Sequence, residues 1–191
     1  MSTEATVEVV AVLFSLAAVV LTIRKNVWCW PAGLVGVTAY LWVFRALRLY
    51  ADMGLQVVFF VQGVYGWHFW LRGGENHTPA PVRRLGKNSF FVTLLTLGIA
   101  TIVLGAGLSR WTDASLPYLD SLLSVTSLTA NMLLASKILE SWFLWIGADV
   151  LYVGMFVFKG VYLTAGLYVV FLGLACAGLS RWLAEERGGA G

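Results

Sequence analysis

Charged residues are scarce in this sequence. Only 12% of its 191 residues are Asp, Glu, Lys or Arg, whereas soluble domains contain about 25%. Hydrophobic residues make up 59% of the chain, and its mean hydropathy is +0.80. So little charge cannot cover the surface of a water-soluble domain of this size. We therefore predict an all-α integral membrane protein that is largely surrounded by lipid.

Cysteine and histidine are also rare, with two of each. Cys29 and Cys176 have no spacing typical of a disulfide framework or a metal site. Neither a nucleophile–base pair nor a nucleotide-binding loop is apparent. The net charge of +3 is spread over loops, which does not favour nucleic-acid binding. We expect no enzyme, no cofactor and no metal, and the start MSTEATVEVV lacks the basic region of a signal peptide.

Long apolar runs dominate what is present. Each is close to the roughly 20 residues that cross a bilayer. They cover residues 5–22, 28–46, 53–71, 90–108, 117–137, 140–159 and 161–179. A single long polar loop, residues 72–89, follows the third run and is rich in Gly, Pro and charge. We therefore predict seven transmembrane helices.

The basic residues predict the orientation, because cytoplasmic loops carry an excess of Lys and Arg. Nine of them follow the odd-numbered spans: Arg24, Lys25, Arg72, Arg83, Arg84, Lys87, Lys137, Arg181 and Arg187. Four lie on the opposite side: Arg45, Arg48, Arg110 and Lys159. This asymmetry places the N-terminus outside and the C-terminus in the cytoplasm.

An internal repeat becomes visible when the chain is shifted by 114 residues. The shift superimposes Trp28 on Trp142, Phe44 on Phe158 and Leu49 on Leu163. Four spans separate the copies, so both point the same way across the membrane. We expect two parallel three-helix bundles joined by a linker helix (3+1+3), with a substrate between them near the midplane. Chance similarity between apolar helices is the alternative.

The sixth run carries an acidic residue in its middle. Helical spacings of three and four place a set of aromatic side chains on the same face as this acid. They are Trp142, Trp145, Asp149, Tyr152 and Phe156. An acid in lipid is costly unless it faces a cavity or a partner, so we interpret this face as the wall of a substrate pathway. An aromatic packing seam is the alternative.

Other polar residues follow the same helical spacing. The fifth run has a stripe of Asp120, Ser124, Ser127 and Asn131, and the third has Gln56, Phe60, Gly63 and Trp67. Trp42 adds a ring from the second run. In the alternative interpretation, hydroxyls bond their own backbone and amides hold helices together. Indoles, a carboxylate and amides together favour a flat, positively charged ring bearing polar groups. The scarcity of Arg in the spans disfavours a phosphate.

Two runs carry a resemblance to a known family. LYADMGLQVVFFVQGVYGWHFW (residues 49–70) and SKILESWFLWIGADV (residues 136–150) resemble the signature blocks of the PnuC vitamin transporters. The similarity covers about residues 24–182. The resemblance implies a SWEET-like fold, facilitated diffusion of nicotinamide riboside trapped by phosphorylation, a homotrimer, and a bacterial inner-membrane location. It also implies that Gln56, Asn131, Trp142, Trp145 and position 149 line the site.

The resemblance leaves the vitamin open. Members tied to nicotinamide riboside often have Asn where this chain has Asp149, and thiamine or riboflavin carriage is the alternative. A lipid-acting enzyme and a non-transporting membrane subunit are further alternatives. We expect residues 1–72 to form the first bundle, 73–112 the cytoplasmic loop and linker helix, 113–183 the second bundle, and 184–191 a cytoplasmic tail. The candidate site comprises Trp42, Gln56, Phe60, Ser127, Asn131, Trp142, Trp145, Asp149 and Tyr152.

Overall fold

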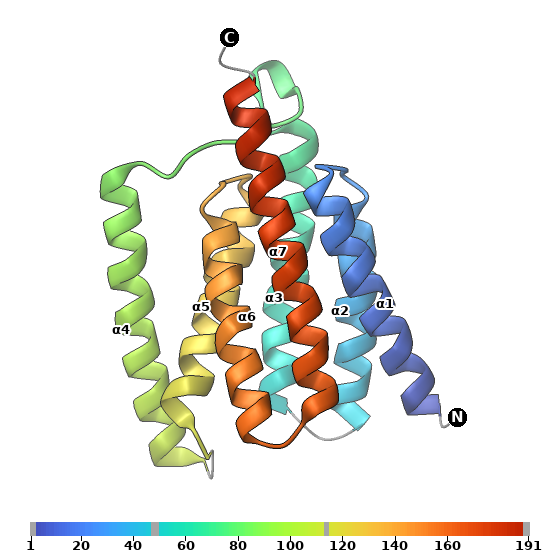
Figure 1. Cartoon of the computed structure of the whole chain (residues 1–191), viewed down its shortest axis with the longest axis vertical. Helices are drawn as coiled ribbons and strands as arrows, with labels where there is room; N and C mark the ends of the chain where they lie inside the picture. Colours follow the sequence, from blue (N-terminus) through green and yellow to red (C-terminus); the bar gives the residue numbers. More distant parts are fainter. Residues whose placement is uncertain (1–2, 47–49, 113–114, 189–191) are drawn as a thin grey trace.

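Seven α-helices run roughly along one direction in the computed structural model (Figure 1). The structure describes residues 3–46, 50–112 and 115–188, so Arg48 and Leu49, used above for charge and repeat, lie outside the described residues. The helices are α1 (Thr3–Ile23), α2 (Cys29–Ala46), α3 (Tyr50–Arg72), α4 (Lys87–Trp111), α5 (Pro117–Ala135), α6 (Ser141–Phe158) and α7 (Tyr162–Gly188). A short 3-10 helix, η1 (Glu75–His77), lies in the α3–α4 loop.

The prediction of seven helices in an all-α membrane protein is confirmed. By length and composition, four of the described helices qualify as membrane spans: α1, α4, α6 and α7. The limits of two helices have a clear cause in the sequence. Pro117 occupies the first turn of α5, where its missing N–H is not needed. Gly160 adopts a φ of 72° just after α6, a conformation that glycine accepts without strain.

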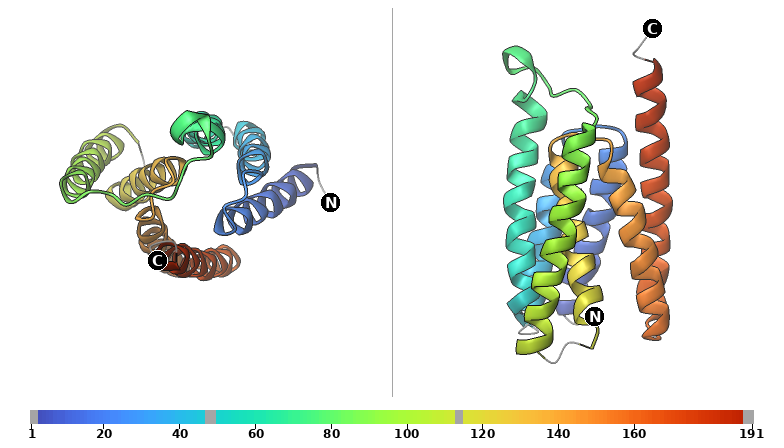
Figure 2. Two further views of the ribbon diagram at one scale, coloured as in Figure 1. Left: turned by 90° about the horizontal axis from the view of Figure 1, so that it is seen from above. Right: turned by 90° about the vertical axis from the view of Figure 1, so that its left-hand side faces the viewer.

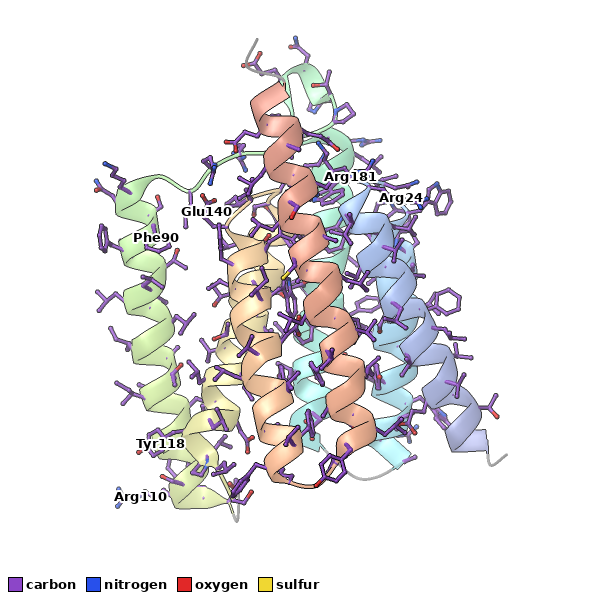
Figure 3. All side chains as sticks on the ribbon, viewed as in Figure 1. Arg24, Phe90, Arg110, Tyr118, Glu140 and Arg181 are labelled. Carbon is purple, nitrogen blue, oxygen red and sulfur yellow. The ribbon has the colours of Figure 1, made fainter. Side chains whose placement is uncertain are left out.

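The helices form two groups of three with one helix outside. Within the groups, α1 packs on α2 and α2 on α3, while α5 packs on α6 and α6 on α7. The groups meet where α3 contacts α5 and where α1 contacts α7 (Figure 2). Among the described helices, α4 packs against α5 alone. Gly105 and Tyr118 make this contact possible, because a Cβ on Gly105 would lie 2.4 Å from the Tyr118 ring (Figure 3).

The two ends of the molecule differ in their connections. The α1–α2 turn, the α3–α4 loop and the α5–α6 turn lie at the end that carries the C-terminus, which we call the C-terminal end (Figure 1). Arg24, Glu140 and Arg181 lie towards this end, and Arg110 lies at the opposite end (Figure 3).

The two groups are related by a shift of 112 residues, so the predicted register of 114 is wrong by two. Lys25 and Lys137 occupy equivalent turns, with left-handed φ values of 53° and 57°. The ring pair Trp30–Trp70 (5.5 Å, 87°) has its counterpart in Trp142–Trp182 (5.6 Å, 85°). The equivalent of Trp142 is therefore the buried Trp30. Trp28, which the 114-residue shift selects, is 65% exposed.

The same shift also aligns two short blocks of sequence. Residues 54–59 read GLQVVF and residues 166–171 read GLYVVF. The gapless shift of 114 misaligned them because Val, Leu and Phe recur so often in apolar helices that several matches arise at the wrong register. Because α3 and α7 carry these blocks at equivalent positions, Gln56 of the first copy corresponds to Tyr168 of the second.

Each copy buries a tryptophan against a glycine of the next helix. A Cβ on Gly66 would lie 2.5 Å from the Trp30 ring, and one on Gly178 would lie 2.5 Å from the Trp142 ring. Real Cβ atoms do not approach other atoms this closely, so the ring or the helix would have to move. These two glycines therefore allow α2 to pack on α3 and α6 to pack on α7.

We predict that Gly178→Ala destabilises the protein by about 1–3 kcal/mol through overpacking against Trp142. Thermal unfolding in detergent, followed by tryptophan fluorescence, measures the change. Gly173→Ala is the matched control on α7, because a Cβ there meets nothing within 4 Å. A melting temperature that falls equally in both variants would contradict the close packing.

Candidate functional site

A pair of amide side chains joins the two groups of helices beside the last two turns of α5. Asn131 of α5 donates from Nδ2 to Oε1 of Gln62 on α3, at 2.8 Å. Gln62 donates in turn from Nε2 to the Leu128 carbonyl, at 3.2 Å. Among the described residues, Oδ1 of Asn131 has no hydrogen-bond partner. The pair thus fixes a carboxamide between the groups and leaves one acceptor for a ligand.

Gln62 was not among the sequence candidates, which included Gln56 instead. The predicted face of α3 held Gln56, Phe60, Gly63 and Trp67, whereas the face toward α5 holds Gln62. Because each residue turns a helix by about 100°, Gln56 and Gln62 lie about 120° apart around α3, so they belong to different faces. One signal in the sequence could have identified Gln62. It shares a helix face with Gly66 and Trp70, at spacings of four, and both of those residues are expected to be buried.

Asp149 lies buried on α6, with 4% of its surface exposed. No basic side chain among the residues that the structure describes forms an ion pair with it. Its electrostatic neighbours include Tyr152 on the same helix and Tyr168 on α7. A carboxylate in this position can balance a positive charge on a ligand.

Stacked aromatic rings lie beside Asp149, from α6 and α7. Tyr152 stacks on Tyr168 with centroids 4.4 Å apart and planes 23° apart. Phe156 stacks on the same Tyr168 at 5.4 Å. The Tyr152 hydroxyl also reaches the side chain of Ser127, a buried residue of α5. Sequence analysis missed Tyr168, although the repeated GLQVVF and GLYVVF blocks place it opposite Gln56 of the other copy.

Two kinds of polar side chain occur on α5. Ser121 donates to the Pro117 carbonyl at 2.7 Å, and Thr129 donates to the Val125 carbonyl at 2.8 Å. Both thus bond their own helix, as the alternative interpretation of such residues expects. Ser127 and Asn131 instead meet side chains of other helices, Tyr152 and Gln62.

The remaining candidates have other surroundings. Trp142 is 2% exposed and belongs to a cluster with Trp30, Trp70 and Trp182 at the C-terminal end, against which the half-buried Trp145 packs. Trp42 and Phe60 are 42% and 41% exposed and line a shallow outer groove between α2 and α3. The expected grouping of Trp42 and Phe60 with Asn131 is therefore not observed, because both rings point outward from α2 and α3. Gln56 is half-buried.

Comparison with known proteins agrees with the family resemblance over almost the whole chain. The model of the family described as nicotinamide mononucleotide transporter matches residues 5–184. The nicotinamide riboside transporter PnuC of Escherichia coli is 26% identical, with 95% of this chain and 87% of that protein covered. The riboflavin/roseoflavin transporter RibM of Streptomyces davaonensis is 22% identical, with coverages of 94% and 85%.

A solved structure shares the fold. The crystal structure of the vitamin B3 transporter PnuC superimposes with a TM-score of 0.75 at 21% identity, covering 96% of this chain and 83% of that one. The likeness extends through all seven helices of the 3+1+3 arrangement. The family match over residues 5–184 is decisive: this chain belongs to the PnuC family of the nicotinamide mononucleotide transporters.

Proposed function

We propose that this protein carries nicotinamide riboside across the bacterial inner membrane by facilitated diffusion. The observations that support this most are the Gln62–Asn131 amide pair between the two parallel bundles and the buried Asp149 on α6. Amides can bind the hydroxyls and carboxamide of such a ligand, and a buried carboxylate can balance a pyridinium charge. Phosphorylation in the cytoplasm would trap the product and so maintain the inward gradient.

The binding site in this proposal comprises side chains from four helices. Gln62 and Asn131 hold the polar groups of the ligand, while Asp149 faces its positive ring. The rings of Tyr152 and Tyr168, stacked 4.4 Å apart, supply an aromatic wall beside Asp149. The Ser127 side chain lies near the Tyr152 hydroxyl, and Trp145, one turn from Asp149, bounds the proposed site towards the C-terminal end.

The direction and the assembly are also part of the proposal. The nine basic residues at the C-terminal end favour a cytoplasmic position for that end, with the N-terminus outside. We propose residues 1–72 as the first bundle, 73–112 as the loop with α4, 113–183 as the second bundle and 184–191 as the tail, into which α7 continues as far as Gly188. A homotrimer in the bilayer is the assembly that the family resemblance favours. The exposed apolar surface of α4, which packs only on α5 among the described helices, leaves room for such contacts.

Riboflavin is the second candidate substrate. The similarity to RibM extends over 94% of this chain, nearly as far as the similarity to PnuC of E. coli. Riboflavin is flat and bears hydroxyls but carries no positive charge. Asp149 is the residue that separates the two ligands, because a carboxylate favours the cation and gives a neutral ring no such advantage.

We predict that Gln62→Leu and Asn131→Leu each reduce uptake of labelled nicotinamide riboside into proteoliposomes by tenfold or more. Either change removes a hydrogen-bonding amide and leaves its partner unpaired, which costs about 1–3 kcal/mol. Thr129→Ala is the control on α5, because Thr129 bonds its own helix, and it should change uptake less than twofold. If Gln56→Leu abolished uptake while Gln62→Leu preserved it, the site would lie on the face of α3 first predicted.

Replacing Asp149 tests the substrate class. We expect Asp149→Asn to lower the ratio of nicotinamide riboside affinity to riboflavin affinity about tenfold, equivalent to about 1.4 kcal/mol. The carboxylate attracts only the cation, whereas the amide keeps the size and polarity of the side chain. Tryptophan quenching by nicotinamide riboside, thiamine and riboflavin measures the ratio. An unchanged preference across the three vitamins would assign Asp149 to helix packing.

A further inference from the structure

Two indole N–H groups cross between the bundles in a reciprocal pattern. Trp70 of α3 donates from Nε1 to the Leu134 carbonyl of α5, at 3.2 Å. Trp182 of α7 donates from Nε1 to the Thr22 carbonyl of α1, at 3.3 Å. The repeat shift of 112 relates Trp70 to Trp182 and Thr22 to Leu134, so each bundle donates the same bond to the other.

These two indoles form the centre of a continuous row of four. Trp30 contacts Trp70 at 5.5 Å, Trp70 contacts Trp182 at 6.1 Å, and Trp182 contacts Trp142 at 5.6 Å. Trp70 and Trp182 are 2% and 0% exposed. The row therefore fills the space between the bundles at the C-terminal end. A solute moving along the repeat axis towards that end meets the Trp70–Trp182 contact.

The α3–α4 loop fastens this end from outside. Lys137 donates from Nζ to the Ala80 carbonyl at 2.7 Å, and its ammonium lies 4.7 Å from the centre of the Trp70 ring. Arg83 of the loop pairs with the α5–α6 turn through backbone bonds to Lys137 and Leu139, at 2.9 and 3.0 Å. On the other side of the row, the equivalent Lys25 forms an ion pair with Glu185 of α7. On each side of the row, a lysine therefore binds a segment outside its own turn. Lys137 binds the α3–α4 loop, and Lys25 binds α7.

The two outer tryptophans of the row, Trp30 and Trp142, are not fully hydrogen-bonded. The indole N–H groups of Trp30 and Trp142 are buried and have no hydrogen-bond partner among the described residues. A buried donor without a partner is unfavourable relative to one that is hydrated. Parting the bundles at this end would break the two indole bonds and the Lys25–Glu185 ion pair, but it would allow water to reach two unpaired indoles. The closed and open forms are therefore closer in free energy than complete burial of four tryptophans suggests.

We propose that the Trp70–Trp182 contact is the gate of the transport pathway at the C-terminal end and that the structure shows it closed. This inference rests on the proposed transport function. Opening separates α3 from α5 and α7 from α1, with each bundle moving as a unit. Because the two cross-bundle bonds are equivalent, the gate opens symmetrically about the repeat axis, although the binding site is built mainly from the second copy.

The native thiol of Cys29 reports on this gate. It is free, 3% exposed, and belongs to the same buried cluster as Trp30 and Trp70. Cys176, the other thiol, is exposed and is removed by Cys176→Ser. In that background, the rate at which a water-soluble methanethiosulfonate modifies Cys29 in purified, reconstituted protein measures the opening of the C-terminal end.

We expect Trp70→Phe and Trp182→Phe each to raise the Cys29 modification rate about fivefold, and the double variant by tenfold or more. Phenylalanine keeps an aromatic ring but loses the N–H, so the closed state loses one cross-bundle bond per substitution, a change of about fivefold for a typical hydrogen bond. Trp28→Phe is the matched control, because Trp28 is 65% exposed and lies outside the row, and it should leave the rate unchanged. If the double variant fails to fold, the single variants carry the test.

A static packing role gives a different result. Gly105→Ala crowds Tyr118 at the far end and destabilises the protein without touching the row. If Gly105→Ala accelerates Cys29 modification as much as the Trp variants do at equal loss of melting temperature, the row is only core. Unchanged modification in the double variant with intact uptake would also overturn the gate while leaving the transport function standing. Accelerated modification in a protein that carries none of the three vitamins would instead retain the gate and remove the proposed substrate.

Discussion

Only a few directional bonds hold the two bundles together in their apolar surroundings. The way the bundles sit against each other depends on these bonds. Among the described residues, the side-chain interactions that cross the boundary include the Gln62–Asn131 pair, the two indole bonds of Trp70 and Trp182, and the Lys25–Glu185 ion pair. Lipid offers no competing hydrogen-bond partners, so these bonds stabilise the arrangement seen in the structure. Contacts between bundles are otherwise limited to α3 against α5 and α1 against α7. The tryptophan cluster at the C-terminal end is shared by both bundles, so a movement of one bundle against the other would divide that cluster.

The repeat accounts for the packing of the helices, which we call the frame. The polar positions that differ between the two copies account for the proposed site. Tyr40 and Phe44 stack in the first copy as Tyr152 and Phe156 stack in the second, at 5.7 and 6.1 Å. The polar residues do not follow the repeat. The shift of 112 relates Asn131 to Val19, Asp149 to Val37 and Gln62 to Leu174. A single asymmetric ligand on the axis requires such differences, since it cannot present the same atoms to both copies.

The sequence was sufficient for the helices and insufficient for their faces. Apolar runs of membrane length leave few alternatives to helices, because backbone groups in lipid must be satisfied within the segment. The choice of face was less secure. A helix in lipid is apolar on all sides, so the usual contrast between a wet and a dry face is missing, and Gln56 could not be told from Gln62 by hydrophobicity. Trp42 and Phe60 are exposed, and their burial could not be predicted for the same reason, since large aromatics suit lipid and protein equally.

The buried acid was the more reliable signal. Asp149 is costly in lipid wherever it lies, so its presence alone predicted an inward position, and it is buried. The same reasoning explains how one fold can include relatives named for nicotinamide riboside and for riboflavin. The frame relies on glycine–tryptophan contacts and repeated turns that lie outside the proposed site. The proposed site instead consists of a few polar positions at which the copies already differ. Changing those positions leaves the cross-bundle tryptophan bonds intact, so the preferred vitamin can change while the moving parts stay the same.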